Sequence, residues 1–343
     1  MMKNTRKILK FLEQKGNSIS PLLILTHDYP DADALASAFA FQYIAEKKFG
    51  IDSRIAYGGV IGRPENREMV RLLKIPARKL RGIDLKRYAN VALVDTQPAF
   101  KNNSYPANRD ATIVIDQHQS AAAPSSELTV VDTNSGATSV ILAKLLLTLK
   151  IPVPVAVGTG LVYGILSDTL NLLRASRTDV RIYRDLLPYC DMQILARIQN
   201  PPRSKRFFAT LAKGIEKAKV AGGLIVSHLG TVENPDLVSQ MADFFLTYQH
   251  CKWAFCTGRH KGSLRLSLRI ADSRYSAGEI LRQVVEQRVE AGGHGPIAGG
   301  RIRVGLEVPE KKWRNIENSV NYRLCKTLKI GKRYQFHNLF KPS

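Results

Sequence analysis

The sequence lacks long apolar runs and contains few cysteines. No apolar segment approaches the roughly 18 residues that a membrane span requires, which excludes a transmembrane protein. The basic N-terminus continues into the charged segment 11–15, where a secretory signal would have its apolar core. The four cysteines form no C-x-x-C pair and have no nearby histidine at zinc-finger spacing, and four free thiols in a large chain fit a reducing compartment better than a disulfide framework. We therefore expect a soluble, cytoplasmic protein.

Acidic residues are scarce compared with basic ones. The chain has 51 Lys and Arg against 29 Asp and Glu, a formal net charge of +22. A surplus of this size favours polyanionic partners such as nucleic acid, nucleotides or anionic lipid. Apolar residues make up 44% of the sequence, which is typical of a globular protein rather than a disordered one. At about 100–200 residues per domain, a chain of 343 residues predicts two domains.

The first half of the chain alternates short apolar runs with helical patterns. Runs that are apolar throughout are typical of strands buried on both faces of a parallel sheet. The predicted strands are 22–26, 53–57, 91–95 and 112–116, and the clearest predicted helices are 34–48 and 137–149. We expect an α/β domain with a mostly parallel sheet flanked by helices.

A second pattern begins at Gly222, with predicted strands at 224–229, 253–256 and 264–270 and a helix at 278–289. A glycine-rich run, Gly292–Gly300, follows this helix. These segments predict a smaller α/β domain with a mixed sheet, separated from the first domain by a cleft. The expected organisation is a first domain at 1–195, a helical linker at 196–221, a second domain at 222–310 and a basic C-terminal tail at 311–343.

Acidic and histidine side chains follow the predicted strands of the first domain. They are His27, Asp31 and Asp33 after the first strand, Asp95 at the end of 91–95, Asp116 to His118 at the end of 112–116, and Asp168 in or beside a helix. The carboxyl ends of parallel strands meet at one edge of a sheet. Converging carboxylates repel one another unless cations lie between them, and a carboxylate and imidazole set suits Mn²⁺ or a similar divalent ion.

Structural roles for the same residues stay open at this point. A single Asp after a strand most often caps a helix or forms a turn, and an isolated His27 would more often be a loop residue than a ligand. Asp28 is assigned to capping or to solvent. The spacing alone favours a metal site and these structural roles about equally.

Taken together, the segments resemble the DHH phosphoesterase family, specifically the two-domain nanoRNase/pAp-phosphatase branch with a DHH-associated C-terminal domain. The likeness runs in the family's order from about residue 20 to residue 305. The matching stretches are His27–Ser37, Leu93–Pro98, Val114–His118, Gly136–Ser139, Tyr163–Thr169, Leu266–Arg269 and Gly292–Gly300.

The resemblance implies roles for individual residues. One metal would be held by His27, Asp31 and Asp95, and a second by Asp33, Asp95 and Asp168, with Asp95 bridging the two. His118 would contact the scissile phosphate, so that His118 and Asp95 are the expected catalytic residues. The implied substrate-binding residues, besides His118, are Arg269, Gly292, Gly293, His294, Gly299 and Gly300.

One position departs from the family pattern. The family's third motif reads Asp-His-His, and its first His completes the second metal site, whereas this chain has Gln117 there. An amide oxygen is a weaker ligand than imidazole for a transition metal, although Mn²⁺ and Mg²⁺ accept oxygen ligands. We expect an enzyme that keeps its activity with an altered metal preference. A weaker second metal and a large loss of activity are the alternatives.

These observations predict a divalent-metal-dependent phosphodiesterase that uses a two-metal Mn²⁺ site, with Mg²⁺ as the alternative. The resemblance points to short single-stranded RNA or DNA oligonucleotides as substrates, with 3′-phosphoadenosine 5′-phosphate or cyclic-dinucleotide products as alternatives. A rival interpretation is a catalytically weakened scaffold that binds nucleotides or nucleic acid, and a third is a longer-chain exonuclease. The basic tail either binds single strands or forms a solvated face. The sequence allows a homodimer but does not determine the oligomeric state.

Overall fold

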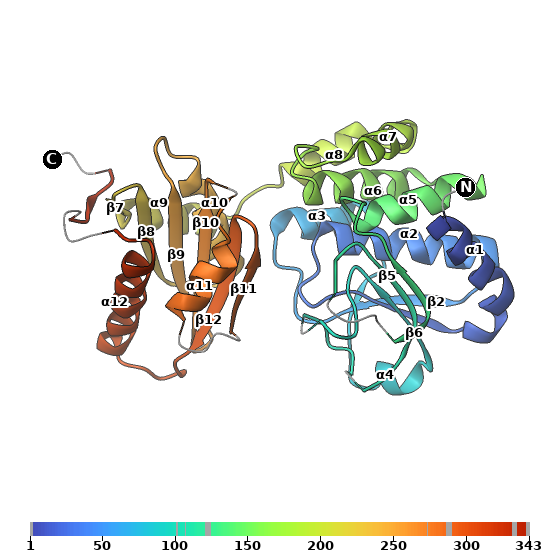
Figure 1. The fold of residues 1–343 in the computed structure, drawn as a ribbon, viewed down its shortest axis with the longest axis horizontal. Coiled ribbons are helices and arrows are strands. Elements are labelled where there is room, and N and C mark those ends of the chain that lie inside the picture. Colours follow the sequence, from blue (N-terminus) through green and yellow to red (C-terminus); the bar gives the residue numbers. More distant parts are fainter. Residues whose placement is uncertain are drawn as a thin grey trace. The chain divides into compact units, whose positions relative to one another are not determined.

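Two units of secondary structure, each with its own β-sheet, make up the chain (Figure 1). The computed structural model describes residues 3–100, 102–106, 108–120, 125–272, 274–285, 290–330 and 335–340. The chain divides between Pro202 and Arg203, inside the segment that the sequence predicts to be a linker. No helix within the described residues is long and apolar enough to cross a membrane.

The first unit contains a six-stranded sheet in the order β3-β2-β1-β4-β5-β6, and every strand pair in it is parallel. Its elements are α1 (Lys3–Lys15), β1 (Leu22–Leu25), α2 (Ala32–Phe49), β2 (Ser53–Tyr57), α3 (Pro64–Leu73), β3 (Arg78–Lys79), α4 (Asp84–Arg87), β4 (Asn90–Val94), β5 (Ala111–Asp116), β6 (Ser126–Val131), α5 (Thr138–Leu149), α6 (Val155–Asp168), α7 (Arg177–Leu186) and α8 (Met192–Gln199).

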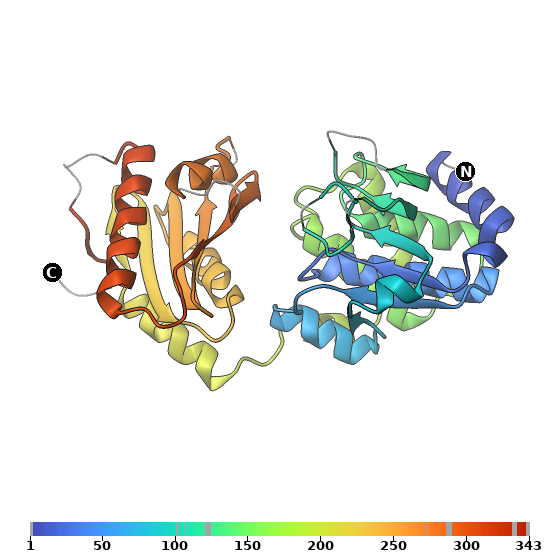
Figure 2. The same cartoon turned by 90° about the horizontal axis from the view of Figure 1, so that it is seen from below.

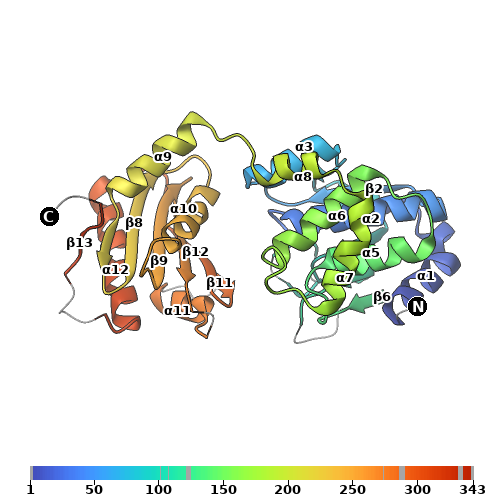
Figure 3. The ribbon, with the colours of Figure 1, turned by 90° about the horizontal axis from the view of Figure 1, so that it is seen from above.

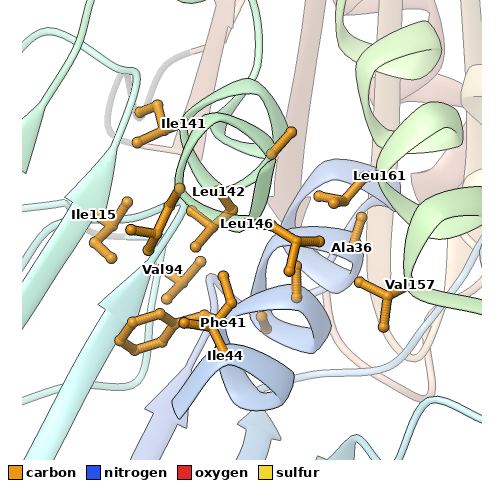
Figure 4. Packing of buried hydrophobic residues seen from close by; sticks show 14 of the residues in the cluster. Ala36, Phe41, Ile44, Val94, Ile115, Ile141, Leu142, Leu146, Val157 and Leu161 are labelled. Carbon is orange, nitrogen blue, oxygen red and sulfur yellow. The ribbon is translucent and has the colours of Figure 1, made fainter. Parts of the chain in front are cut away.

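Alternate residues of the central strands face two different clusters. Ile24 in β1 and Val94 in β4 belong to the main core with α2, α5 and α6, whereas Leu25 and Leu93 belong to a smaller cluster on the other face. Figure 4 shows side chains of α2, α5 and α6 converging on those of the strands, Phe41 and Val94 among them. Burial on both faces explains why these strands are apolar throughout.

The strand order reverses between β1 and β4. The sheet continues from β1 through β2 to β3 in one direction, and from β4 through β5 to β6 in the other. Leu25 at the end of β1 pairs with Leu93 near the end of β4. In open α/β sheets, ligands bind beyond the carboxyl ends of the strands at such a reversal. The segments that leave β1 and β4 carry His27 and Asp95.

The second unit contains a seven-stranded sheet in the order β11-β12-β10-β9-β8-β7-β13. The sheet is mixed, because β8 and β9 are parallel while the other pairs are antiparallel. Its elements are α9 (Lys205–Glu216), β7 (Lys219–Ala221), β8 (Leu224–Thr231), α10 (Asp236–Leu246), β9 (Trp253–His260), β10 (Ser263–Ile270), α11 (Ala277–Val284), β11 (Ala291–His294), β12 (Ile297–Arg303), α12 (Glu310–Thr327) and β13 (His337–Asn338).

The second sheet is covered by helices on both faces. Leu224 and Phe255 pack with α11 and α12, whereas Ile225 and Ala254, their neighbours along the strands, pack with α9 and α10. The views in Figures 2 and 3 show these two helical layers on opposite sides of the strands. This alternation is the pleat of a sheet with two buried faces.

The structure confirms the predicted fold class, with a parallel sheet flanked by helices and a second, mixed sheet. It differs from the sequence-based expectation in three places. Residues 219–221, expected to lie in a helical linker, form β7 of the second sheet. The glycine-rich run forms an antiparallel hairpin, in which Gly292 pairs with Gly299. The expected basic tail contains α12, whose Trp313, Val320 and Leu324 are buried in the second core.

Candidate metal centre

His27 stands two residues beyond β1 with one ring nitrogen already occupied. Its Nδ1 lies 2.9 Å from the carbonyl oxygen of Asp28. A backbone carbonyl can only accept, so Nδ1 carries the proton, and Nε2 is the ring nitrogen that faces the acidic residues. Nε2 lies 3.6 Å from Asp31 Oδ2 and 3.7 Å from Asp95 Oδ2. Protein ligands to metals are commonly held in this way, with the second ring nitrogen bonded to a carbonyl.

Asp31 has a structural role and leaves one oxygen available. As the N-cap of α2, it accepts a hydrogen bond from the Ala34 amide through Oδ1, at 3.0 Å. Its other oxygen, Oδ2, faces His27. The capping role that the sequence leaves open for this residue is therefore real, and it fixes the carboxylate in an orientation that a cation can use.

Asp95 joins two groups of donor atoms. It follows β4 with a left-handed backbone (φ +60°), a conformation that is uncommon for residues other than glycine. Thr138 donates to its Oδ1 at 2.8 Å, and Oδ2 faces His27. His27, Asp31 and Asp95 form one group whose donor atoms lie within 4.8 Å of one another. Asp95, Asp116 and His118 form a second such group.

The first group fits a divalent ion. Bonds of about 2.0–2.2 Å to imidazole nitrogen or carboxylate oxygen place two donors of one ion roughly 3–4 Å apart. The separations of 3.6 and 3.7 Å from His27 Nε2 to the two carboxylates agree with this spacing. A single imidazole with two carboxylates is the donor chemistry that Mn²⁺ accepts.

Asp33 and Asp168, the residues expected at the second metal, are engaged in internal hydrogen bonds. The backbone amides of Thr138 and Ser139 donate to the two oxygens of Asp33 at 2.7 and 2.8 Å. The Gln117 amide donates to Asp168 Oδ2 at 2.8 Å. Asp168 is the last residue of α6, in agreement with its predicted place in or beside a helix. Neither aspartate belongs to the two donor groups found among the described residues.

Asp116 orients His118. Its Oδ1 lies 2.8 Å from His118 Nδ1 and accepts from the Gln117 backbone amide at 2.7 Å. Its Oδ2 accepts from Gln97 Nε2 at 2.7 Å, and the same amide nitrogen donates to the His118 carbonyl. The His118 side chain is 43% exposed, whereas the Asp116 side chain is fully buried. Asp116 therefore supports an imidazole that solvent and ligands can reach.

Burial and mutual repulsion act together on the carboxylates. Burial raises the pKa of Asp33 to about 6, and the charge of Asp31 adds to this effect. Burial and then the charges of neighbouring aspartates raise the pKa of Asp95 well above its usual range, and the same causes raise the pKa of Asp168. Carboxyl groups that share a site without a cation behave in this way, because each negative charge disfavours the next.

The pKa values of His27 and Asp31 shift in the directions that favour the charged form of each group. Burial alone lowers the pKa of His27, but the nearby carboxylate of Asp31 outweighs burial and raises it to about 9. Burial opposes ionisation of Asp31 as well, yet the same pairing holds its pKa well below the usual range. Without a metal, the Nε2 of His27 therefore carries a proton at neutral pH, and a metal that binds there must displace that proton.

Three residues around the centre escape the sequence-based analysis. Gln97 holds Asp116, and its Oε1 is buried without a hydrogen-bond partner among the described residues. Thr138 holds Asp95. The positive charge of Arg63 favours the ionised forms of both Asp31 and Asp168. Gln97 and Thr138 lie in the matching stretches Leu93–Pro98 and Gly136–Ser139, which could have pointed to them. Arg63 lies outside every matching stretch, and nothing in the sequence around it distinguishes it from a surface residue.

Apart from His118, the residues expected to bind substrate lie in the second unit. Arg269 is buried and bonded to Asp243, Ser267 and the carbonyl oxygens of Leu268 and Ala298. Among the predicted glycines, Gly292, Gly293, Gly299 and Gly300 lie on the two paired strands of the β11–β12 hairpin. The backbone of His294 ends β11, and its side chain is outside the described structure.

No family model matches the sequence. The chain is 34% identical over 308 residues to the uncharacterized protein MJ1633 of Methanocaldococcus jannaschii. The aligned stretch covers 89% of this chain and 63% of that protein. It is 27% identical over 166 residues to a probable manganese-dependent inorganic pyrophosphatase of Streptococcus pyogenes, covering 47% of this chain and 52% of the pyrophosphatase. An exopolyphosphatase-related protein from Bacteroides fragilis has a similar structure, with a TM-score of 0.74 and 13% identity over 96% of this chain and all of that one.

The structural similarity confirms the two-sheet α/β fold. The fold and the sequence similarity to the pyrophosphatase together support the resemblance to DHH-family phosphoesterases, without selecting the nanoRNase branch. The chain spans less than two thirds of the length of the curated relatives that it matches.

Proposed function

We propose that this chain is a divalent-metal-dependent phosphoesterase that hydrolyses short oligonucleotides. The observation that carries the proposal is the group formed by His27, Asp31 and Asp95 at the reversal of the parallel sheet. These donors face one another at metal-binding separations, and no Lys or Arg ion pair is described for the buried carboxylate of Asp95. Burial and the neighbouring carboxylates disfavour the ionised form of Asp95, and a bound cation would favour it.

The first ion would be held by His27 Nε2, Asp31 Oδ2 and an oxygen of Asp95. A second ion would draw on Asp95, Asp33 and Asp168, with Gln117 in the position of a ligand. When bound, such ions polarise a phosphoryl oxygen and lower the pKa of water. Mn²⁺ is the proposed ion, supported by the mixed donor set and by the similarity to a manganese-dependent pyrophosphatase. Mg²⁺ is the alternative, since it also accepts oxygen ligands.

His118 is proposed to act on the phosphate. The hydrogen bond from its Nδ1 to Asp116 raises the pKa of His118, which favours the protonated ring. With Nδ1 held by Asp116, the proton at Nε2 is the one that can be donated to a phosphoryl or leaving oxygen. Gln97 holds Asp116 from the other side. The three residues thereby fix the orientation of the imidazole in the absence of substrate.

Oligonucleotides are the substrates that the charge of the chain supports. A net charge of +22 attracts a polyanion and makes its binding sensitive to salt. The second unit is proposed to bind the substrate through Arg269, His294 and the glycines of the hairpin. 3′-Phosphoadenosine 5′-phosphate and cyclic-dinucleotide products are alternatives of the same chemical class.

Inorganic pyrophosphate or short polyphosphate is a second candidate substrate. It is favoured by the similarity to an inorganic pyrophosphatase and to an exopolyphosphatase-related protein. The rival to both candidates is a scaffold that binds nucleotides without turnover, and Gln117 is the residue that favours it. The side-chain amide of Gln117 already donates to Asp168 Oδ2, and this hydrogen bond occupies a lone pair of the carboxylate that a second ion would need.

A hydrolysis assay on the full chain separates these alternatives. The substrates are a labelled RNA dinucleotide, an RNA pentanucleotide, 3′-phosphoadenosine 5′-phosphate and inorganic pyrophosphate, each with Mn²⁺, Mg²⁺ or EDTA. Asp95→Asn tests the centre, and the exposed Asp52→Asn is the matched control. Mononucleotide release that requires a metal and disappears only in Asp95→Asn is the expected result. Release of phosphate from pyrophosphate alone would replace the oligonucleotide proposal, and salt-sensitive binding without turnover would favour the scaffold.

A further inference from the structure

A large cavity lies wholly in the second unit, apart from the metal centre. Its volume is about 790 Å³, within the range of roughly 300–1,000 Å³ that is usual for small-molecule sites. It is lined by residues of α9, β7, β8, β9 and α12 and by residues 336 and 338. In the order of the sheet it belongs to the β8-β7-β13 end, whereas the glycine hairpin forms the opposite end. None of the predicted substrate-binding residues lines it.

Three lysines at the cavity have no described ion pair, although the exposed Glu216 lines the same cavity. Lys213, Lys217 and Lys219 are exposed, and no ion pair is described for any of them within the resolved ranges of the structure. The deeper cation, Arg259, is different. It pairs with Glu317 at 2.9 Å and with Glu310 at 2.5 Å. An anionic ligand would therefore be bound by the lysines, because Arg259 is already occupied.

Asn321, which lines the cavity, carries a buried hydrogen-bond acceptor that has no donor in the described structure. His228 Nδ1 lies 2.7 Å from Thr257 Oγ1, and Asn321 Nδ2 lies 2.7 Å from His228 Nε2. Burial lowers the pKa of His228, so the ring is neutral and its Nε2 accepts from Asn321. Asn321 Oδ1 is then buried without a partner in the described structure. Leaving such an atom unpaired is unfavourable, and an N–H donor from a ligand would satisfy it.

Phe336 adds an aromatic surface at the same cavity. Its side chain lines the cavity and the residue is 38% exposed. An aromatic ring that is open to solvent beside lysines suits a ligand with both a flat ring and negative charge. From these three features we propose that the cavity binds a nucleotide. Its phosphates would contact Lys213, Lys217 and Lys219, its base would lie against Phe336, and an amino group of the base would donate to Asn321 Oδ1.

This proposal goes beyond the proposed hydrolysis and is tested without it. The full-length Asp95→Asn variant is titrated calorimetrically in EDTA with ATP, AMP, adenosine or tripolyphosphate, so that neither metal nor turnover contributes. We expect ATP to bind, with adenosine and tripolyphosphate each weaker by about 10-fold or more because each lacks one half of the contacts. Replacing Lys213, Lys217 and Lys219 together by alanine should weaken ATP by about 10-fold or more. Lys252→Ala, an exposed lysine outside the cavity, is the control and should leave the affinity unchanged.

Asn321→Ala separates recognition of the base from attraction of an anion. It should weaken ATP about 10-fold and leave tripolyphosphate unchanged, because only the base contacts Asn321. Tryptophan fluorescence checks that each variant is folded, since both tryptophans, Trp253 and Trp313, lie in this unit. Absence of ATP binding, or ATP binding that the triple lysine variant leaves unchanged, would overturn the proposal. Equal affinity for ATP and tripolyphosphate, with no effect of Asn321→Ala, would show an anion site and refute the assignment to a nucleotide.

Discussion

The two units contain different arrangements of buried charge. In the second unit the largely buried Arg259 lies beside Glu317, and the buried Arg269 lies beside Asp243. In the first unit Asp33, Asp95 and Asp116 are at most 2% exposed, no Lys or Arg ion pair is described for any of the three, and the partners described for Asp95 and Asp116 are His27 and His118. Unlike an arginine, an imidazole can give up its proton to a metal, and a cluster of carboxylates is stabilised by a cation between them. The contrast favours the first unit as the place for a metal.

The same contrast exists within the metal centre. His27, Asp31 and Asp95 direct donor atoms at one another, with a proton on His27 Nε2 that a metal would replace, whereas Asp33 and Asp168 accept hydrogen bonds from backbone amides and from Gln117. We therefore expect the first side of the centre to bind an ion more tightly than the second.

The largest effect is expected from Asp95→Asn. The substitution removes the charge shared by both donor groups and preserves an oxygen that can accept from Thr138. We expect kcat/KM with Mn²⁺ to fall by about 1,000-fold or more, which is about 4 kcal/mol of transition-state stabilisation. Steady-state kinetics of the variant beside Asp52→Asn measures this. Activity within a few-fold of the wild type would refute the role of Asp95.

The paired charges of the second unit predict a stability effect instead. Arg259→Met leaves Glu317 buried without its cation, and the free energy of unfolding should fall by about 3 kcal/mol. Urea denaturation followed by tryptophan fluorescence reports this unit alone, because both tryptophans belong to it. The double variant Arg259→Met/Glu317→Leu should recover part of the loss. If the double variant loses as much as the two single variants combined, the ion pair does not explain the effect.

Gln117→His is predicted to sharpen the asymmetry within the metal centre. Imidazole in place of the amide supplies a ligand and frees Asp168 from the hydrogen bond that it now accepts. Binding of the second Mn²⁺ should tighten by about 10- to 100-fold, with a change in turnover. Titration with Mn²⁺ beside the matched variant Gln117→Leu measures the stoichiometry and affinity. Unchanged stoichiometry and unchanged turnover in Gln117→His would show that this position is not limiting.

The smallest predicted effect is a pH dependence of the second unit. Burial lowers the pKa of His228 below 6.5, so the unfolded chain takes up a proton at a pH where the folded chain does not. The free energy of unfolding therefore decreases as the pH falls through 6.5. The loss for this residue between about pH 7.5 and about pH 5.5 is at most about 1.4 kcal/mol. His228→Gln should show a smaller loss over that interval in urea denaturation. An equal loss in both proteins would assign the pH dependence to other groups.

The strands, and the grouping of His27 with Asp95 at one edge of the sheet, are the parts of this molecule that the sequence predicts well. Strands such as β1 and β4 are apolar throughout because both of their faces are buried, and that constraint is visible residue by residue. His27 and Asp95 are predictable for a related reason, since strand ends of a parallel sheet collect at one edge. The roles of Asp33 and Asp168 are less predictable, because the amides that occupy them come from distant segments.

Long-range partners also explain what the sequence does not reveal in the second unit. Glycine suits a tight loop and a closely packed hairpin alike, and only the pairing of Gly292 with Gly299 decides between them. Arg269 is bonded to Asp243, a partner on another element that the sequence around Arg269 does not reveal. Helix α12 had a detectable pattern in Trp313, Val320 and Leu324, but the many charges between these residues hide it.

Binding of Mn²⁺ to the metal-free protein tests the central claim most directly. Titration with Mn²⁺ at neutral pH, followed by the electron paramagnetic resonance of the free ion, is carried out on the wild type, Asp95→Asn and Asp52→Asn. We predict at least one tightly bound Mn²⁺ per chain in the wild type and in Asp52→Asn, and none in Asp95→Asn. Failure of the wild type to bind Mn²⁺, or equal binding by Asp95→Asn, would contradict the assignment of the clustered carboxylates to a metal centre.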